Sequence, residues 1–495
     1  SLTTIVGSNS LEITQVKPFN KKMGSIRTDS IQFGEGNFLR AFVDYCIQLL
    51  NEKTSFSGKV DIIQPLPNGM IEQLKKQNGK YHLYHEGVLQ GKNIRNGQLI
   101  DCIDKMINPY QEFDNFLKLA ENENLTFIFS NTTEAGISLD EEDQFTVTPA
   151  KSFPGKVTQL LHHRYKTFNG DITKVLHIIP CELIDKNGSK LKEIILELCK
   201  IWKLEDTFVS WIHQNHFYNT LVDRIVPGFP KKDLEFYKKG LSHDDQLIVT
   251  CEPFFLWVIE GNSKLLEIFP ADQLKNIDVK VVPDLGIYRT RKVRILNGSH
   301  TTLVPVGLLH GTTTVSETLQ DNFLKHFLSQ TLFEEIIPSI DFDRQPLEDY
   351  AQSILERFSN PFIIHQLESI SLNSISKFKV RVLPSLLSFY KKKGEVPENL
   401  TFAMAALFYF YGKEISKHPY PLKDDAQNIL FFKKVWENNE IEKVVSETLS
   451  NTALWDQNLA RIGPLKDRLT KALNAIVSQD KISEAYHIFK ALSHE

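Results

Sequence analysis

The sequence predicts an α/β protein, with a Rossmann-type dinucleotide-binding domain at the N-terminus followed by a mostly α-helical domain. Three observations predict this architecture. A glycine-rich turn follows a short apolar strand near residue 31, and short β-branched or aromatic runs then alternate with helical patterns up to about residue 285. Beyond that point almost every segment has helical period. We expect residues 1–285 to bind the dinucleotide and residues 286–495 to form a helical substrate and catalytic domain.

The glycine-rich turn comes first in the chain. An apolar strand at residues 31–33 runs into Gly34 and Gly36. In such a turn the first glycine permits a tight bend, and the second lets the backbone approach a pyrophosphate at a helix N-terminus. Leu39 replaces the third glycine of the usual fingerprint, and many glycine pairs are only turns. A helical pattern and a second strand at residues 60–63 nevertheless follow in βαβ order, which favours dinucleotide binding.

The end of the second strand bears on the choice of cofactor. An acidic residue usually stands there and binds the adenosine ribose, but this chain has Gln64 and Pro65, while Asp61 lies inside the strand. No arginine stands at this turn to hold a 2′-phosphate. The turn therefore favours NAD over NADP.

Later segments extend both parts of the fold. We predict strands of a largely parallel sheet at residues 125–129, 175–179 and 279–282. After residue 285, Thr314 and Glu317 have the spacing of a capping box that opens a helix running through residue 328.

Two further helices complete the predicted C-terminal part. One begins near Pro346, and another ends with lysines in its last turn and a stop at Gly394.

Composition excludes several classes of partner. The net charge is −4 and no long basic block exists, which argues against a nucleic-acid partner. The apolar stretch 400–411 is too short to cross a bilayer and predicts a buried helix, not a membrane span. Five scattered cysteines without a CxxC motif indicate reduced thiols in a cytoplasmic protein, with no metal site. Histidine pairs at 162–163 and 213/216 lack a nearby carboxylate at ligand spacing, which favours ordinary imidazoles.

The run from Lys292 to His300 is the strongest candidate for chemistry. If it is α-helical, Arg289, Asn297 and His300 lie within about 140° of Lys292 around the helix axis. A lysine can act as a general base when burial and a cationic neighbour such as Arg289 lower its pKa. An amide such as Asn297 can donate to an oxyanion. The alternative is a basic helix with a solvated lysine and a capping asparagine.

From about residue 30 to the C-terminus, the chain resembles the mannitol dehydrogenase family of long-chain polyol dehydrogenases. The resemblance rests on an ordered series of motifs: Gly34-x-Gly36-x-Phe38-x-Arg40, Asn131-Thr-Thr-Glu134-x-Gly136, Asn187-Gly188, Val222-Asp223-Arg224-Ile225-x-Pro227, Glu252-Pro253-Phe254-x-x-Trp257, Lys292-x4-Asn297-x2-His300 and Asn360-Pro361. Within the family, residues 31–44, 129–138, 178–185 and 295–306 look most like members acting on sugar acids. That likeness implies metal-independent, NAD-dependent interconversion of D-altronate and D-tagaturonate.

The resemblance also implies roles for single residues. Lys292 matches the general acid/base lysine, Asn297 the oxyanion-polarising amide and His300 a residue that positions substrate hydroxyls. Asp223 and Lys377 match substrate-binding positions. Cofactor contacts are expected from two segments, at Phe33, Gly34, Gly36, Asn37, Phe38, Arg40, Asn131, Thr132 and Glu134.

Two departures argue against mannitol as the substrate. Polyol-specific members carry an asparagine in the segment that here spans residues 181–183, and an arginine where this chain has Ser369. A sugar acid adds a carboxylate, which requires a cation or backbone donors. Arg289, Lys377 and Arg381 are the candidates. Arg381 could instead be a surface helix residue, and Arg289 could be a neighbour that tunes the pKa of the lysine.

Two other functions stay open at this point. The chain could reduce fructuronate or another ketose or polyol, or it could be a nucleotide-binding regulatory protein that has lost its chemistry. The complete set of Lys292, Asn297 and His300 argues against the regulatory alternative. For the assembly we expect a monomer or a weak dimer.

Overall fold

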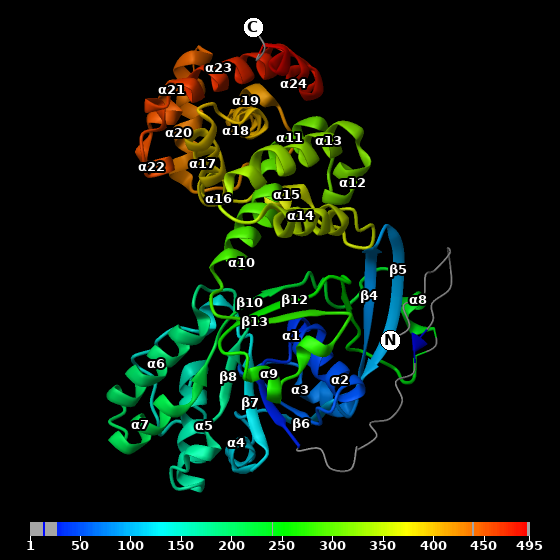
Figure 1. Ribbon diagram of the computed structural model, residues 1–495, viewed down its shortest axis with the longest axis vertical. Helices are drawn as coiled ribbons and strands as arrows, with labels where there is room; N and C mark the ends of the chain where they lie inside the picture. Colours follow the sequence, from blue (N-terminus) through cyan, green and yellow to red (C-terminus); the bar gives the residue numbers. More distant parts are fainter. Residues whose placement is uncertain (1–12, 15–26, 240, 438–439, 493–495) are drawn as a thin grey trace. The chain divides into compact units, whose positions relative to one another are not determined.

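The computed structural model describes residues 13–14, 27–239, 241–437 and 440–492. The chain divides into two compact units, Ser1–Gly286 and Ile287–Glu495, which we call the N-terminal and C-terminal units (Figure 1). The N-terminal unit is an α/β structure and the C-terminal unit is helical. The predicted fold class is confirmed.

A six-stranded, fully parallel sheet forms the centre of the N-terminal unit, in the order β6-β3-β2-β7-β8-β9. In chain order this arrangement is 3-2-1-4-5-6, the strand order of dinucleotide-binding folds. The strands before β7 are added on one side of β2 and the later strands on the other, so the strand order reverses between β2 and β7. In such sheets ligands bind outside the carboxyl ends of the strands at this switch point. The strands are β2 (Asp29–Phe33), β3 (Val60–Ile63), β6 (Ile103–Ile107), β7 (Leu125–Ser130), β8 (His177–Pro180) and β9 (His216–Phe217).

Helices cover both faces of this sheet. Neighbouring residues of a strand point to opposite faces, and apolar side chains on both faces must be covered. On β7, Ile128 belongs to one hydrophobic core, whereas Phe127 and Phe129 belong to the other. The core containing Ile128 is closed by α4 (Phe113–Lys118), α5 (Phe153–Thr167), α6 (Asn187–Ile201) and α7 (Asp206–Gln214). The opposite core is closed by α1 (Asn37–Ala41), α2 (Val43–Lys53) and α3 (Ile71–Lys76).

Two smaller sheets complete the N-terminal unit. One has the order β1-β5-β4-β11, and the other the order β10-β12-β13. Residues 279–282 form a strand as predicted, but they pair with β12 and not with the central sheet, so that part of the prediction is wrong. The pattern of apolar residues in the sequence identifies a strand but not the strand with which it pairs. The remaining elements are β1 (Ile13–Thr14), β4 (Tyr81–Leu89), β5 (Lys92–Ile100), β10 (Asn219–Asp223), α8 (Leu234–Lys238), β11 (Val249–Cys251), β12 (Leu256–Glu260), α9 (Leu265–Ile268) and β13 (Asp278–Val282).

The C-terminal unit is built around α18 (Glu398–Tyr411), which is buried along nearly its whole length and packs on α11 (Gly298–His310) and α23 (Gly463–Ser478). No helix among the described residues combines the length and apolar character needed to cross a membrane. The other helices are α10 (Gly286–Arg291), α12 (Val315–Gln320), α13 (Asn322–Gln330), α14 (Arg344–Phe358), α15 (Leu367–Ile370), α16 (Ser374–Arg381), α17 (Leu383–Lys393), α19 (Lys413–Ser416), α20 (Ala426–Trp436), α21 (Ile441–Ser450), α22 (Thr452–Trp455) and α24 (Ile482–Ala491).

Capping residues set several of these helix ends. The capping box is present, with the Glu317 amide donating to Thr314 Oγ1 at 3.3 Å. The single helix predicted through residue 328 is instead two helices, because Asp321 accepts a hydrogen bond from the Leu324 amide at 3.0 Å and starts α13. Gly394 ends α17 with φ of 75°, a conformation that glycine adopts without strain.

Candidate functional site

The glycine turn after β2 lies next to the end of β7. The Gly34 amide donates to the Ile63 carbonyl at 2.9 Å, and the Asn131 amide donates to the Phe33 carbonyl at 3.2 Å. Gly34 has φ of +124°, and a Cβ there would stand 3.1 Å from the Asn131 carbonyl oxygen, so both conformation and space require glycine. At Gly36 a Cβ would meet no atom within 4 Å. The backbone at Gly36 is therefore open to a ligand, at the edge where dinucleotides bind.

Two of the residues expected to contact cofactor support this turn from within the protein. Phe33 is fully buried against Phe153, with ring centroids 5.2 Å apart. Arg40 is 1% exposed, and its guanidinium donates to the Glu35 carbonyl at 2.9 Å, the Leu247 carbonyl at 2.7 Å and Asn37 Oδ1 at 2.9 Å. In this structure both side chains hold the turn in place and neither presents a polar group to solvent.

The segment after β7 is fixed by a residue that sequence reasoning did not single out. Glu182, 2% exposed, accepts hydrogen bonds from Ser130 Oγ at 3.0 Å and from both the amide and Oγ1 of Thr132 at 3.1 Å. Burial raises the pKa of the Glu182 carboxyl despite these hydrogen bonds. Its position just after β8, one strand from β7, was the available signal. Glu134 begins a short 3-10 helix (Glu134–Gly136), but its side chain lies outside the described residues.

The end of β3 offers no carboxylate to a ribose. Gln64 Nε2 donates to the Leu66 and Pro67 carbonyls at 2.9 and 3.1 Å, so this side chain shapes its own loop. Asp61 points to the neighbouring strand and accepts from the Lys105 amide at 3.0 Å. Burial raises the pKa of Asp61 to about 6.

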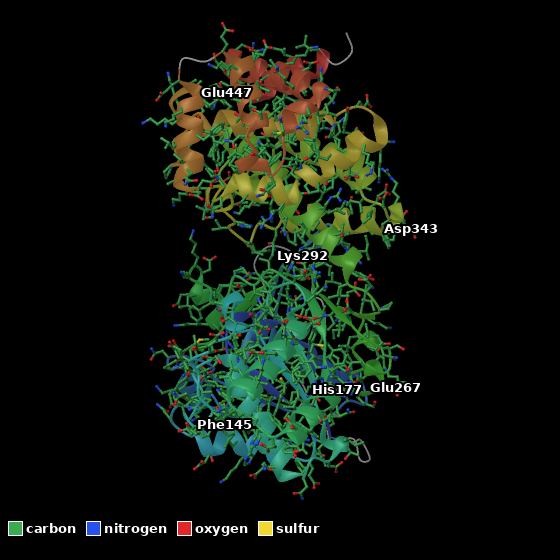
Figure 2. All side chains as sticks on the ribbon, turned by 90° about the vertical axis from the view of Figure 1, so that its left-hand side faces the viewer. Phe145, His177, Glu267, Lys292, Asp343 and Glu447 are labelled. Carbon is green, nitrogen blue, oxygen red and sulfur yellow. The ribbon has the colours of Figure 1, made fainter. Side chains whose placement is uncertain are left out.

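In the C-terminal unit, Lys292 begins a π-helical segment. Residues Lys292–Asn297 are π-helical and continue from α10 into α11; the Lys292 side chain is labelled in Figure 2. The helix predicted here is present, but the assumption of 100° per residue is wrong, because an i→i+5 repeat changes the angular offset between Lys292 and Asn297. Such segments are rare and occur frequently at functional sites.

The rings of Phe358 and His365 and the backbone of α16 pack closely against the start of α11. The His300 ring stacks on Phe358 at 4.2 Å between centroids and 11° between planes. The same ring meets His365 edge-on at 5.2 Å and 79°. A Cβ on Gly298 would lie 3.0 Å from the Arg381 carbonyl oxygen, so α16 approaches α11 closely at this glycine.

That approach brings two cations of α16 to the same region. Lys377 Nζ donates to the Ile370 carbonyl at 2.8 Å. Burial and the charge of Arg381 lower the pKa of Lys377, against the opposing influence of Asp424. Burial also lowers the pKa of Arg381. These half-buried groups make the region electropositive, which suits an anionic ligand.

The other predicted binding residues lie as follows. Asp223 ends β10 in the N-terminal unit and is 4% exposed. Arg289 is half-exposed on α10. The nearby Arg294 is a structural residue, because its Nε donates to Ser385 Oγ at 2.8 Å and its Nη2 to Ser339 Oγ at 2.7 Å.

Several histidines and acids outside these regions are engaged in hydrogen bonds. Among the described residues, one group of three possible metal ligands comes together, with donor atoms of His82, His243 and Asp245 within 4.8 Å of one another. These atoms already take part in a closed ring of polar contacts, in which Gln77 Nε2 also lies 3.4 Å from His243 Nε2. Asp245 accepts from His82 Nδ1 at 2.9 Å and from Gln77 Nε2 at 2.9 Å, and Ser242 Oγ lies 3.2 Å from His82 Nε2 and 3.1 Å from His243 Nδ1.

The histidine pair at residues 162–163 contacts carboxylates, and the cysteines are buried. His162 and His163 contact Glu205 and Glu121, each at 2.9 Å. The five cysteines are buried free thiols.

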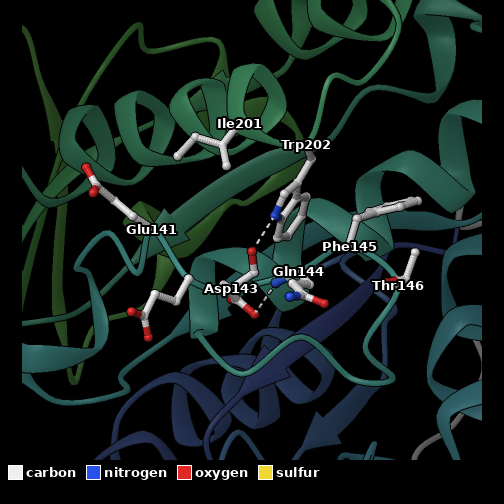
Figure 3. Close-up of a pocket in the computed structure, with 8 residues that line it drawn as sticks. Glu141, Asp143, Gln144, Phe145, Thr146, Ile201 and Trp202 are labelled. Atoms are coloured by element: carbon white, nitrogen blue, oxygen red, sulfur yellow. Dashed lines mark hydrogen bonds between the residues drawn. The ribbon is translucent and has the colours of Figure 1, made fainter.

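The N-terminal unit also has a surface pocket that involves none of the candidate site residues. It is lined by residues 141–146 with Ile201 and Trp202, and Trp202 Nε1 donates to the Asp143 carbonyl at 2.8 Å (Figure 3). None of the candidate catalytic or cofactor-binding residues lines it. We do not assign it to the site.

Comparison with known proteins identifies the class to which this fold and these residues belong. The mannitol dehydrogenase Rossmann domain matches residues 28–268, and the mannitol dehydrogenase C-terminal domain matches residues 284–477. The chain belongs to the mannitol dehydrogenase family, as the sequence motifs predicted.

Its relatives within that family are more specific. The altronate oxidoreductase of Bacillus subtilis is 43% identical over 449 residues, covering 90% of this chain and 92% of that protein. The altronate oxidoreductase of Yersinia enterocolitica is 42% identical over 454 residues, covering 90% and 94%. That of Bacteroides thetaiotaomicron is 41% identical over 454 residues, covering 90% and 94%.

Solved structures share the fold at lower identity. A substrate-free D-sorbitol dehydrogenase superposes with a TM-score of 0.76 at 19% identity, covering 96% of this chain and 97% of the other. Mannitol 2-dehydrogenase of Pseudomonas fluorescens, in a ternary complex with NAD and D-mannitol, gives 0.64 at 19% identity, covering 98% and 97%. These likenesses concern the fold.

Proposed function

We propose that this protein is an NAD-dependent oxidoreductase that interconverts D-tagaturonate and D-altronate. Identity of 43% to an altronate oxidoreductase along 90% of the chain carries the proposal. The electropositive region formed by Lys377 and Arg381 supports a substrate with a carboxylate. We assign dinucleotide binding to the N-terminal unit, and proton transfer and substrate recognition to the C-terminal unit.

The described residues fit a dinucleotide. The parallel sheet has the 3-2-1-4-5-6 order, the turn at Gly34 is tight, and the backbone at Gly36 is open. Neither an acid nor an arginine follows β3, so the adenosine ribose is held by other groups, and we favour NAD(H) over NADP(H) because nothing there would bind a 2′-phosphate. The nicotinamide, when bound, supplies or accepts the hydride.

The residues of the C-terminal unit do the proton chemistry. In reduction, the Asn297 amide donates a hydrogen bond to the ketone oxygen and stabilises negative charge as it develops. Lys292, in its ammonium form, gives a proton from Nζ to that oxygen, so the carbonyl becomes a hydroxyl. In oxidation, neutral Lys292 takes the hydroxyl proton back. His300, held flat on Phe358, orients the neighbouring hydroxyls.

One assay tests the proposal. The rate of NADH oxidation is compared for D-tagaturonate, D-fructuronate and D-fructose, with NADPH as the control cofactor. We expect the highest kcat/KM with D-tagaturonate and NADH. A preference for D-fructuronate would keep the mechanism and change the substrate. Binding of NADH without turnover of any of the three would favour a regulatory nucleotide-binding protein.

A further inference from the structure

The backbone around His365, which connects two helices, is fixed by hydrogen bonds to a distant segment. His365 lies between α14 and α15, and backbone hydrogen bonds connect its segment to the start of α12. The Val315 amide donates to the His365 carbonyl at 3.0 Å, and the Leu367 amide donates to the Thr313 carbonyl at 2.9 Å. These two hydrogen bonds fix the backbone from which the imidazole projects.

The imidazole faces two residues already assigned to the site. Its ring meets the edge of His300 at 5.2 Å between centroids. Burial lowers the pKa of His365, and the charge of Lys377 lowers it further, so Lys377 is near enough to act on this ring. Within the part of the chain that the structure describes, no protein group forms a hydrogen bond with either ring nitrogen of His365. A neutral imidazole in this position has a donor to offer to a ligand.

Lys377 and Arg381 place positive charge in the region of His365. Among the described residues, no carboxylate forms an ion pair with Lys377 or Arg381. Asp424, the acid that acts on Lys377, is engaged elsewhere: its Oδ1 accepts from Asn428 Nδ2 at 3.0 Å, and its Oδ2 accepts from the Tyr411 hydroxyl. An anion that binds beside a half-buried cation favours its charged form.

We propose that His365 is a specificity residue that donates a hydrogen bond to the carboxylate of the sugar acid, beside Lys377 and Arg381. This inference rests on the proposed function. It extends the carboxylate-binding set beyond the cations of α10 and α16 to a neutral donor on the connection between α14 and α15.

The test measures discrimination for the carboxylate and not activity alone. His365→Phe keeps an aromatic ring against His300 and removes the donor, while His365→Gln keeps a donor. For each variant, kcat/KM is measured with NADH for D-tagaturonate and for D-tagatose, which carries no carboxylate. His326→Phe, an exposed histidine on α13 of the same unit, serves as the matched control.

We expect His365→Phe to lower kcat/KM for D-tagaturonate by roughly 10- to 100-fold, the range for loss of a hydrogen bond to a charged group, and to leave D-tagatose unchanged. His365→Gln should recover part of that loss, and His326→Phe should behave as wild type. An equal fall for both sugars in both His365 variants, or no fall for either, would overturn the inference. If His365→Phe does not fold, the ratio of the two kcat/KM values in His365→Gln decides, since an unaltered ratio would also overturn it. Failure of the wild type to prefer D-tagaturonate would instead contradict the proposed function.

Discussion

The Glu182 carboxylate fixes Thr132 through two hydrogen bonds of 3.1 Å, one from the backbone amide and one from the hydroxyl. Glu182 follows β8 and Thr132 follows β7, so one buried acid joins the ends of two neighbouring strands at the carboxyl edge of the sheet. The geometry of the loop beside Gly34 therefore depends on a side chain that need not touch the cofactor itself.

Replacing Glu182 by Gln should weaken NADH binding. The amide offers a single acceptor oxygen to three donors, and its NH₂ group faces donors, so Thr132 loses part of its support. We expect the Kd for NADH, measured by fluorescence titration, to rise about 10-fold. Glu205→Gln, which alters a surface acid paired with His162 and Lys166, is the control. Equal affinities in wild type and Glu182→Gln would show that the loop does not need this acid.

Replacing Lys292 by Ala should abolish most turnover while sparing cofactor affinity. Loss of a general acid/base costs roughly 10²- to 10⁴-fold in kcat. Steady-state rates with D-tagaturonate and titration with NADH give the two quantities separately. Lys379→Ala removes another lysine of the C-terminal unit, one that pairs with Asp456 at 3.1 Å, and should leave kcat near wild type. A normal kcat in Lys292→Ala would contradict the assignment of the proton donor.

Gly298→Ala should destabilise the protein although alanine favours helices. The gain in helix propensity is about 1 kcal/mol. It is opposed by a Cβ placed 3.0 Å from the Arg381 carbonyl, a backbone atom that cannot turn aside, and overpacking of this kind costs about 1–3 kcal/mol. Gly463→Ala, where a Cβ would meet nothing within 4 Å, gives the helix gain alone. Thermal unfolding should show Tm lowered in Gly298→Ala and unchanged or raised in Gly463→Ala; the reverse order would refute the close approach of α16.

Asp44 should make the stability of the protein fall as pH rises. Burial raises the pKa of this carboxyl to about 7, against the hydrogen bond from Gln32. The unfolded chain has an ordinary value of about 3.9, so the folded state holds the extra proton between these limits. The stabilisation that this proton gives to the folded state is fully present below about pH 4 and is lost as pH rises toward 7.

The corresponding variant is Asp44→Asn, which still accepts from Gln32. Its free energy of unfolding, from chemical denaturation, should drop less between pH 5 and pH 8 than that of the wild type. Asp272→Asn, at an exposed acid, should follow the wild-type slope. If the free energy of unfolding depends on pH in the same way in all three proteins, titration of Asp44 is not the cause of that dependence.

Sequence reasoning succeeded where a local pattern decides the structure. The strand ending at Phe33, the capping box at Thr314 and the buried helix at residues 400–411 all depend on periodicity or on contacts within a few residues. The family prediction succeeded because several motifs occur in one order along the chain.

The wrong or missing predictions involve one local detail of hydrogen bonding and several contacts between distant segments. Nothing in the residues from Lys292 to Asn297 separates a π-helical segment from an α-helix, since the difference is a shift of one hydrogen-bond partner. Residues 279–282 have the composition of any strand, and their pairing with β12 depends on how the chain returns to the smaller sheet. Glu182 and His365 acquire their surroundings only after strands or helices far apart in sequence have packed.

The polar ring around Asp245 also connects to the glycine turn. Asp245 Oδ1 accepts from the Leu247 amide at 2.7 Å, and the Leu247 carbonyl in turn accepts from Arg40 at 2.7 Å. The backbone amide of Leu247 is thus bonded to the polar ring around Asp245, and its carbonyl is bonded to Arg40 of the glycine turn. We therefore expect the two regions to open together, so that their amide protons exchange with solvent at similar rates.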